Sequence, residues 1–216
     1  MKQYVVIGCG RFGQSVAIKL AELGSEVMVV DDSAEIIQSI ADKVTYAVQA
    51  DATDESALKA LGIRNFDVAI VTIGSDIQSS ILVTLLVKEL GVKHVISKAQ
   101  NPAHAKVLYK IGANRVVFPE KEMGVKVAKS LVSSNVLDLI DLSPDVSILE
   151  IKMRDEWVGK SLVDINMRRM YQVSVIAIKS DEGIDIDIEP DRMLMHSDIL
   201  VVIGNNDNLK KLEAKK

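Results

Sequence analysis

A glycine-rich segment near the N-terminus constrains the fold of this 216-residue chain more than any other feature. Gly8, Gly10 and Gly13 follow an apolar run at residues 4–7, and a helical pattern begins at once after them. In this order the first glycine allows a tight turn, the second lets a diphosphate approach the backbone, and the third lets the helix pack on the strand. The segment predicts a nucleotide-binding βαβ unit, with an anion at the helix N-terminus.

An acidic residue after the next apolar run strengthens this prediction. Asp31 follows residues 26–30, and a carboxylate about 20 residues beyond such a loop accepts hydrogen bonds from the ribose hydroxyls of an adenine nucleotide. Its charge disfavours a 2′-phosphate, so we expect NADP to be excluded. A helix cap or a solvated loop acid is the alternative role, and it suits the neighbouring Asp32 better.

Strand and helix patterns alternate through the first two-thirds of the chain. Strand patterns lie at residues 4–7, 26–30, 45–49, 68–72, 94–97 and 115–118. Helical patterns lie between them, at residues 11–23, 34–41, 54–61, 77–90 and 103–111. The alternation predicts right-handed crossovers and a Rossmann-like, doubly wound parallel sheet of the α/β class.

The pattern changes beyond residue 120. Residues 121–139 read as one long helix, with a break near residues 133–135 as the alternative. Short strand patterns follow at 146–152, 173–179 and 198–203 with little helix between them. Short strands of this kind predict a small α+β lobe. We therefore expect a nucleotide-binding domain with a crossover helix at residues 1–135 and an α+β regulatory domain at residues 136–216.

Composition and charge exclude several classes of function. The net charge of −4 gives no positive field for nucleic acid, and the lone Cys9 excludes an internal disulfide. The three histidines have no zinc-ligand spacing, and no run reaches the roughly 18 apolar residues of a membrane span. The second lobe lacks a Ser/His/Asp set, a His-Asp pair and a Tyr-x-x-x-Lys motif, so we expect a protein that is not an enzyme.

Polar and small residues follow the other strand patterns, at the edge where the carboxyl ends of parallel strands meet. Lys98 is a candidate phosphate contact, with a solvated lysine as the alternative. Glu120 suits a polyphosphate if Mg²⁺ or another divalent cation lies between them. Arg11 lies inside the glycine loop, and its guanidinium can donate two parallel hydrogen bonds to phosphate oxygens. An ordinary surface arginine is the alternative. The remaining candidates at this edge are Phe12, with a packing role, and Asp51, Ala52, Thr53, Ile73 and Gly74.

These residues, taken with the small second lobe, carry a family resemblance along essentially the whole chain. The first-lobe motifs are Gly8-x-Gly10-Arg11-Phe12-Gly13, Val30-Asp31, Ala50-Asp51-Ala52-Thr53-Asp54, Gly62-Ile63, Ile73-Gly74, Lys98-Ala99 and Phe118-Pro119-Glu120-x-x-x-Gly124. The second-lobe residues are Gly159-Lys160-Ser161-Leu162, Arg168, Pro190, Asp198 and Gly204. The combination resembles the RCK family, also called KTN, and within it the short Ktr-type regulatory subunits of Trk/Ktr potassium uptake systems.

The resemblance implies a function and a ligand. It implies a cytoplasmic regulatory subunit, peripherally associated with the cell membrane through a multi-span potassium transporter. The implied ligands are ATP and ADP, or NAD and NADH in some members. The implied assembly is a homodimer whose subunits exchange the helix after residue 120. Such dimers are implied to form a ring.

Roles of single residues follow from the resemblance as well. Arg11 is implied to reach the phosphate of a dimer-mate's nucleotide, and Glu120 to face the γ-phosphate. The segment from Asp51 to Thr53 is implied to line the adenine, although Thr53 or Asp54 could simply cap the next helix.

Arg168 matches a residue with which some Ktr-type subunits bind cyclic di-AMP across a dimer. The sequence departs from that pattern at Arg169 and Met170, and Gln172 stands where glycine is usual. A large side chain there would fill the pocket, which puts cyclic di-AMP in doubt, and a solvated dibasic helix end explains the two arginines equally well.

Three other functions stay open from the sequence. An NAD(H)-responsive regulator of the same family is compatible with Asp31, although Arg11 and Glu120 favour a triphosphate. A small NAD-dependent oxidoreductase shares the glycine loop but would need a catalytic set. A nucleotide-dependent regulator without a transporter partner is the third alternative.

Overall fold

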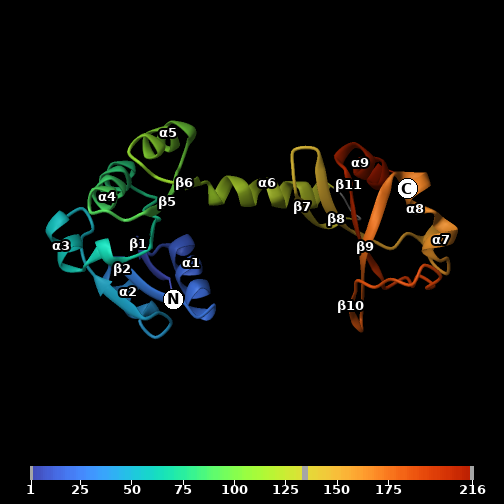
Figure 1. Cartoon of the computed structure of the whole chain (residues 1–216), viewed down its shortest axis with the longest axis horizontal. Helices are drawn as coiled ribbons and strands as arrows, with labels where there is room; N and C mark the ends of the chain where they lie inside the picture. Colours follow the sequence, from blue (N-terminus) through green and yellow to red (C-terminus); the bar gives the residue numbers. More distant parts are fainter. Residues whose placement is uncertain (1, 133–135, 215–216) are drawn as a thin grey trace. The chain divides into compact units, whose positions relative to one another are not determined.

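A computed structural model describes residues 2–132 and 136–214 of the chain (Figure 1). The chain divides into two compact units, residues 1–121 and 122–216. This division falls within α6, Pro119–Val132. The predicted boundary after residue 135 falls on residues outside the described part and stays a prediction.

The first unit is built on a six-stranded parallel sheet with the strand order β3-β2-β1-β4-β5-β6. In chain order the strands are β1 Gln3–Ile7, β2 Glu26–Asp31, β3 Tyr46–Gln49, β4 Val68–Val71, β5 His94–Lys98 and β6 Arg115–Val117. The strand order reverses at β1, which has β2 on one side and β4 on the other. In open α/β sheets such a switch point forms the ligand crevice at the carboxyl ends of the strands.

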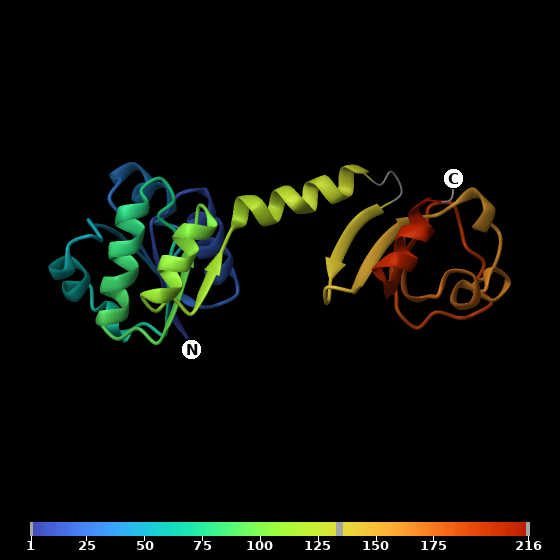
Figure 2. The same cartoon turned by 90° about the horizontal axis from the view of Figure 1, so that it is seen from above.

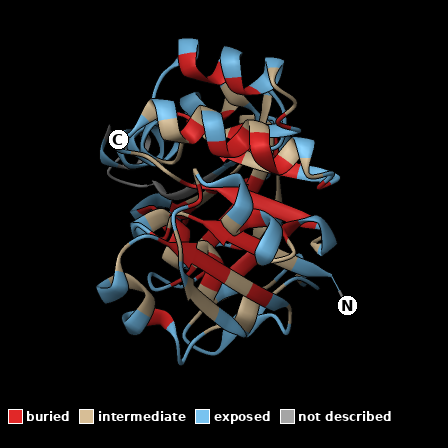
Figure 3. Cartoon of the chain, turned by 90° about the vertical axis from the view of Figure 1, so that its left-hand side faces the viewer, coloured by how far each residue is buried: buried red, intermediate tan, exposed pale blue. Residues whose placement is uncertain are grey.

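Helices cover both faces of this sheet, so its strands are apolar on both sides (Figure 3). They are α1 Arg11–Glu22, α2 Ala34–Ile40, α3 Glu55–Ala60, α4 Ile77–Glu89 and α5 Pro102–Lys110, with a 3₁₀ turn at Ile63–Asn65. One buried cluster joins α1 and α2 to the sheet, and the other joins α3 and α4 to it. The Rossmann-like prediction is confirmed.

The second unit is a five-stranded antiparallel sheet with the order β10-β9-β11-β8-β7. Its strands are β7 Val136–Asp141, β8 Val146–Lys152, β9 Val173–Ser180, β10 Gly183–Asp185 and β11 Ile199–Asn205. Its helices are α7 Leu162–Ile165, α8 Met167–Tyr171 and α9 Asn206–Ala214, with a 3₁₀ turn at Asp155–Trp157. The sheet and these helices enclose one apolar cluster, and the predicted α+β lobe is confirmed.

The prediction of one continuous helix through residue 139 is wrong, and the alternative of a break near residues 133–135 falls on residues outside the described part. α6 ends at Val132, and Val136–Asp141 forms β7, which pairs antiparallel with β8 (Figure 2). A short apolar segment with polar interruptions fits either periodicity, and here a strand partner supplied by β8 decides the outcome.

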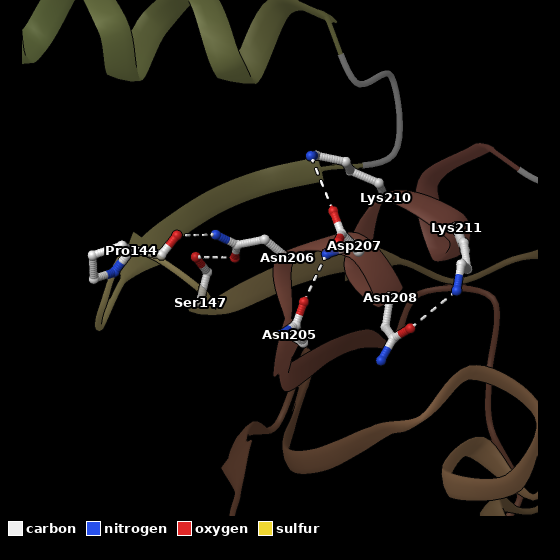
Figure 4. A network of polar contacts seen from close by, with 8 residues as sticks. All are labelled: Pro144, Ser147, Asn205, Asn206, Asp207, Asn208, Lys210 and Lys211. Atoms are coloured by element: carbon white, nitrogen blue, oxygen red, sulfur yellow. Dashed lines mark hydrogen bonds and ion pairs between the residues drawn. The ribbon is translucent and has the colours of Figure 1, made fainter.

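A polar network holds the start of α9 against the turn between β7 and β8 (Figure 4). The Oγ of Ser147, a residue that is 1% exposed, lies 2.7 Å from Oδ1 of Asn206 and 2.9 Å from Oδ1 of Asp141. The Nδ2 of Asn206 donates to the carbonyl oxygen of Pro144 at 2.9 Å. The buried hydroxyl of Ser147 thus has a hydrogen-bond partner in a segment about 60 residues further along the chain, as buried polar groups generally require.

Candidate functional site

The glycine loop packs tightly against the end of β4. Gly8 has φ +83°, and a Cβ atom on it would lie 3.0 Å from the backbone nitrogen of Ile73. A Cβ on Gly13 would lie 2.4 Å from the carbonyl oxygen of Gly8 and 2.6 Å from Oγ1 of Thr72. Real Cβ contacts are longer than this, so the close helix–strand packing predicted for Gly13 requires glycine.

The N-terminus of α1 differs from those of the next four helices. Gly10 precedes α1 and supplies no side-chain acceptor, and a Cβ on it would meet no protein atom within 4 Å. Helices α2 to α5 each begin with a side chain that accepts a backbone N–H, namely Ser33, Asp54, Asp76 and Asn101. The first backbone N–H groups of α1, those of Arg11 and Phe12, therefore have no side-chain cap. Phe12 itself is half-buried. This geometry fits a phosphate group.

Asp31 lies next to this loop, at the carboxyl end of β2. Its Oδ2 accepts a hydrogen bond from the backbone N–H of Cys9, and its Oδ1 accepts one from Ser33 at 2.9 Å. Each carboxylate oxygen keeps a further lone pair for a ribose hydroxyl. Burial, and then the charge of Asp31, raise the pKa of the Cys9 thiol to about 11, so this thiol stays neutral.

The segment after β3 divides into a buried and an exposed part. Ala52 is buried in the core, so its side chain contributes packing. The exposed Asp51 accepts hydrogen bonds from the hydroxyl of Thr53 at 2.6 Å and from its N–H at 2.8 Å, which lower the pKa of Asp51. The cap of α3 is Asp54 and not Thr53. Asp32 is exposed, as expected of a loop acid.

Lys98 and Glu120 form an ion pair at the end of β5 and the start of α6. The Lys98 side chain is 13% exposed, whereas that of Glu120 is 71% exposed. The hydrogen bond from Lys98 holds the pKa of Glu120 below its ordinary value, and the charge of Arg11 adds to the effect. The Nζ of Lys98 would lie 3.0 Å from a Cβ on Gly74, so glycine leaves room for this lysine. Three candidates from three separate elements are thus electrostatically coupled.

Sequence reasoning missed two residues at this edge. The hydroxyl of Thr72 donates to the carbonyl oxygen of Gly8, and the side chain of Gln100 donates to the carbonyl oxygen of Gly74. Thr72 directly follows β4, and Gln100 follows β5 after one intervening residue. Their position at the carboxyl edge of the sheet was the available signal.

Arg168 lies in the second unit, on the exposed side of α8. Its Nε donates to Oγ of Ser174 at 3.3 Å. Gln172 has φ +56°, a left-handed conformation that favours glycine, so the backbone keeps this conformation although the side chain is large.

The described residues form neither a cluster of metal ligands nor a helix that could span a membrane. Among them, no group of three or more His, Cys, Asp or Glu side chains gathers to hold a metal ion. Glu120 alone fits a Mg²⁺ ion that takes most of its ligands from phosphates and water. None of the described helices is long and apolar enough to span a bilayer.

The chain is similar to known proteins along most of its length. Residues 4–119 match the family profile of the TrkA-N domain, and residues 146–216 match that of the TrkA-C domain. The chain belongs to the RCK family. This RCK chain is 45% identical over 212 residues to "Ktr system potassium uptake protein A" of Bacillus subtilis strain 168, covering 98% of this chain and 96% of that protein. It is 42% identical over 214 residues to "Ktr system potassium uptake protein C" of the same organism, covering 99% and 97%.

A solved structure, "GsuK channel bound to NAD", matches the RCK chain with a TM-score of 0.67 at 18% identity. The match covers 98% of this chain and 39% of that one, so the chain spans less than half of the channel. At this identity the match shows the fold alone. The potassium-uptake relatives confirm the resemblance, and they agree with a regulatory RCK protein that is not an enzyme.

Proposed function

We propose that this chain is a nucleotide-gated regulatory subunit that controls a multi-span membrane potassium transporter. The observation that carries the proposal is the uncapped N-terminus of α1 at the switch point of the sheet, in a chain related along its length to Ktr proteins. The subunit works in the cytoplasm, at the membrane surface, because its partner lies in the membrane.

ATP and ADP are the proposed ligands. Arg11 and Lys98 supply two cations near the phosphate end of the site, and Glu120 supplies a carboxylate within their electrostatic range. A triphosphate with Mg²⁺ uses all three groups, since the metal offsets the repulsion between Glu120 and the γ-phosphate. NAD and NADH, which use Asp31 equally well, are the alternative ligands.

Gating follows from a difference in affinity between two shapes of the assembly. The proposed unit is a homodimer, arranged in a ring of dimers. Arg11 is exposed on the first turn of α1, which supports a reach toward a neighbouring subunit's phosphate. ATP and ADP then stabilise different shapes because only ATP carries the γ-phosphate.

A thermal-shift titration of the full chain with ATP, ADP, NAD and NADH, with and without Mg²⁺, tests the ligand. We expect ATP and ADP to raise the unfolding temperature, and Mg²⁺ to strengthen the ATP effect and not the NADH effect. Stabilisation by NADH alone would make the protein an NAD(H)-responsive regulator.

The partner is tested by co-purification from membranes. We expect the chain to retain a multi-span potassium transporter, and to release it when Arg11→Ala removes the guanidinium or when ADP replaces ATP. Retention that ignores both the variant and the nucleotide would contradict nucleotide gating. Hydride transfer from NAD(P)H to carbonyl substrates would instead support the oxidoreductase alternative.

A further inference from the structure

Gln100 links two loops of the first unit at the carboxyl edge of the sheet. It follows Ala99, whose N–H still donates to Val117 in the sheet at 2.9 Å. The Nε2 of Gln100 donates to the carbonyl oxygen of Gly74, which lies 26 residues earlier in the chain. The glutamine therefore connects the end of β5 to the segment between β4 and α4.

The backbone of Gln100 is itself anchored to α5. Its N–H donates to Nδ1 of His104 at 3.4 Å, and the N–H of His104 donates to Oδ1 of Asn101 at 2.9 Å. His104 is only 3% exposed. An anchor on a buried side chain limits how far Gln100 can move, so its amide offers Gly74 a donor from a fixed position.

The segment held by Gln100 adjoins the glycine loop. Ile73 touches Gly8, where an added Cβ would come within 3.0 Å of the Ile73 nitrogen. Further along, Asp76 caps α4 through Gln78 at 2.9 Å. The segment is thus fixed at Ile73 and at Asp76, and the bond from Gln100 to Gly74 fixes its middle.

The expected orientation of a bound nucleotide places the Gly74 segment near the phosphates most distant from adenosine. Asp31 at the end of β2 takes the adenosine ribose, and the glycine loop after β1 takes the first phosphates. β4 lies on the side of β1 opposite to β2, so the Gly74 segment borders the end of the ligand distant from adenosine. A peptide carbonyl turned toward phosphate oxygens is unfavourable, because both carry negative charge.

We infer that Gln100 is a positioning residue that keeps the Gly74 carbonyl turned away from the distal phosphates of a bound nucleotide. This inference rests on the proposed function, because it concerns the same site. Gln100 acts through Gly74 and does not need to touch the ligand. Its loss should therefore weaken ligands that extend past the first phosphate and spare those that do not.

The experiment measures ATP and AMP affinities of the full chain by calorimetry, for the parent and for Gln100→Met and Gln100→Glu. The methionine keeps the size and removes the donor, while the glutamate places a second acceptor against the carbonyl. Gln38→Met, an exposed glutamine on α2, is the matched control. We expect Gln100→Met to weaken ATP about fivefold to tenfold, as for one lost hydrogen bond, and Gln100→Glu to weaken it further.

AMP affinity and the unfolding temperature without nucleotide should stay close to those of the control variant. Equal losses for ATP and AMP would indicate a general structural role and overturn the inference, as would no loss for ATP. The parent protein alone reports on the proposed function: binding of none of the adenine nucleotides would overturn that proposal and the inference with it.

Discussion

The side-chain carboxylate of Asp31 accepts a hydrogen bond from the backbone N–H of Cys9, 22 residues earlier in the chain. The residue expected to bind ribose therefore also holds the glycine loop in place. A second bond, from Ser33 to the other oxygen, joins the start of α2 to the same carboxylate. Loop shape and the proposed ribose recognition rest on one side chain, so we expect ligand binding and stability to be coupled there.

Replacing Asp31 tests this coupling. Asp31→Ala leaves the Cys9 N–H, in a fully buried residue, without its acceptor, which should cost about 1–3 kcal/mol of unfolding free energy. We expect nucleotide affinity to fall as well. Denaturant unfolding and nucleotide titration measure the two effects, with the exposed Asp32→Ala as the control. Equal unfolding free energies for the two variants would contradict a structural role of Asp31.

Two glycines of the same loop should respond differently to alanine. Gly13→Ala places a methyl group 2.4 Å from the Gly8 carbonyl oxygen and should destabilise the fold by about 1–3 kcal/mol. Gly10→Ala meets no protein atom and should change stability by less than about 1 kcal/mol, yet it should weaken nucleotide binding because its methyl group lies where the diphosphate approaches. Unfolding curves and nucleotide titrations separate the two; an unstable Gly10→Ala would count against this division of roles.

Removing Lys98 should change the titration of Glu120. In the wild-type protein the bond from Lys98 lowers the pKa of Glu120, so Lys98→Met should raise that pKa toward the ordinary glutamate range. A pH titration of the Glu120 carboxyl carbon by NMR measures it. Lys59→Met, which breaks an exposed ion pair with Glu55, is the control and should leave Glu120 unchanged. An unchanged pKa in Lys98→Met would show that the ion pair does not form in solution.

His104 should make stability depend on pH. Burial lowers its pKa below 6.5, so the folded protein resists a proton that the unfolded chain accepts. The contribution is complete above about pH 6.5 and is lost as the pH falls toward the folded pKa, with a slope of at most about 1.4 kcal/mol per pH unit. His104→Gln should flatten this slope in urea unfolding measured between pH 7.5 and 5.5, whereas the exposed His196→Gln should not. Parallel slopes for all three proteins would rule out His104 as the cause.

The network at the start of α9 should stabilise the second unit (Figure 4). Asn206→Ala removes one of the two partners of the buried Ser147 hydroxyl, which keeps Asp141, and also removes the donor to Pro144. The loss should cost about 0.5–1.5 kcal/mol of unfolding free energy. Asn208→Ala removes only a contact to Lys211 and is the control in the same helix. Thermal unfolding compares them, and a loss in Asn208→Ala as large as in Asn206→Ala would place the stability elsewhere.

Several features of the site could be predicted from short stretches of sequence. The spacing of Gly8, Gly10 and Gly13 predicts a turn, an open backbone and a close packing contact, because each depends on neighbours within one βαβ unit. Asp31 could be placed for the same reason. The coupling of Lys98 to Glu120 was not predicted as an ion pair, since their approach depends on how β5 and β6 sit side by side.

The sequence by itself determined the class of each domain, since strand and helix periodicity and the glycine spacing are local. It also predicted the glycine loop as the centre of the site. Only the tertiary structure decided that residues 136–141 form a strand, because β8 supplies the backbone partners that the segment lacks alone. Only the tertiary structure decided that Thr72 and Gln100 hold Gly8 and Gly74, since these pairs are 64 and 26 residues apart and meet only when parallel strands align their carboxyl ends.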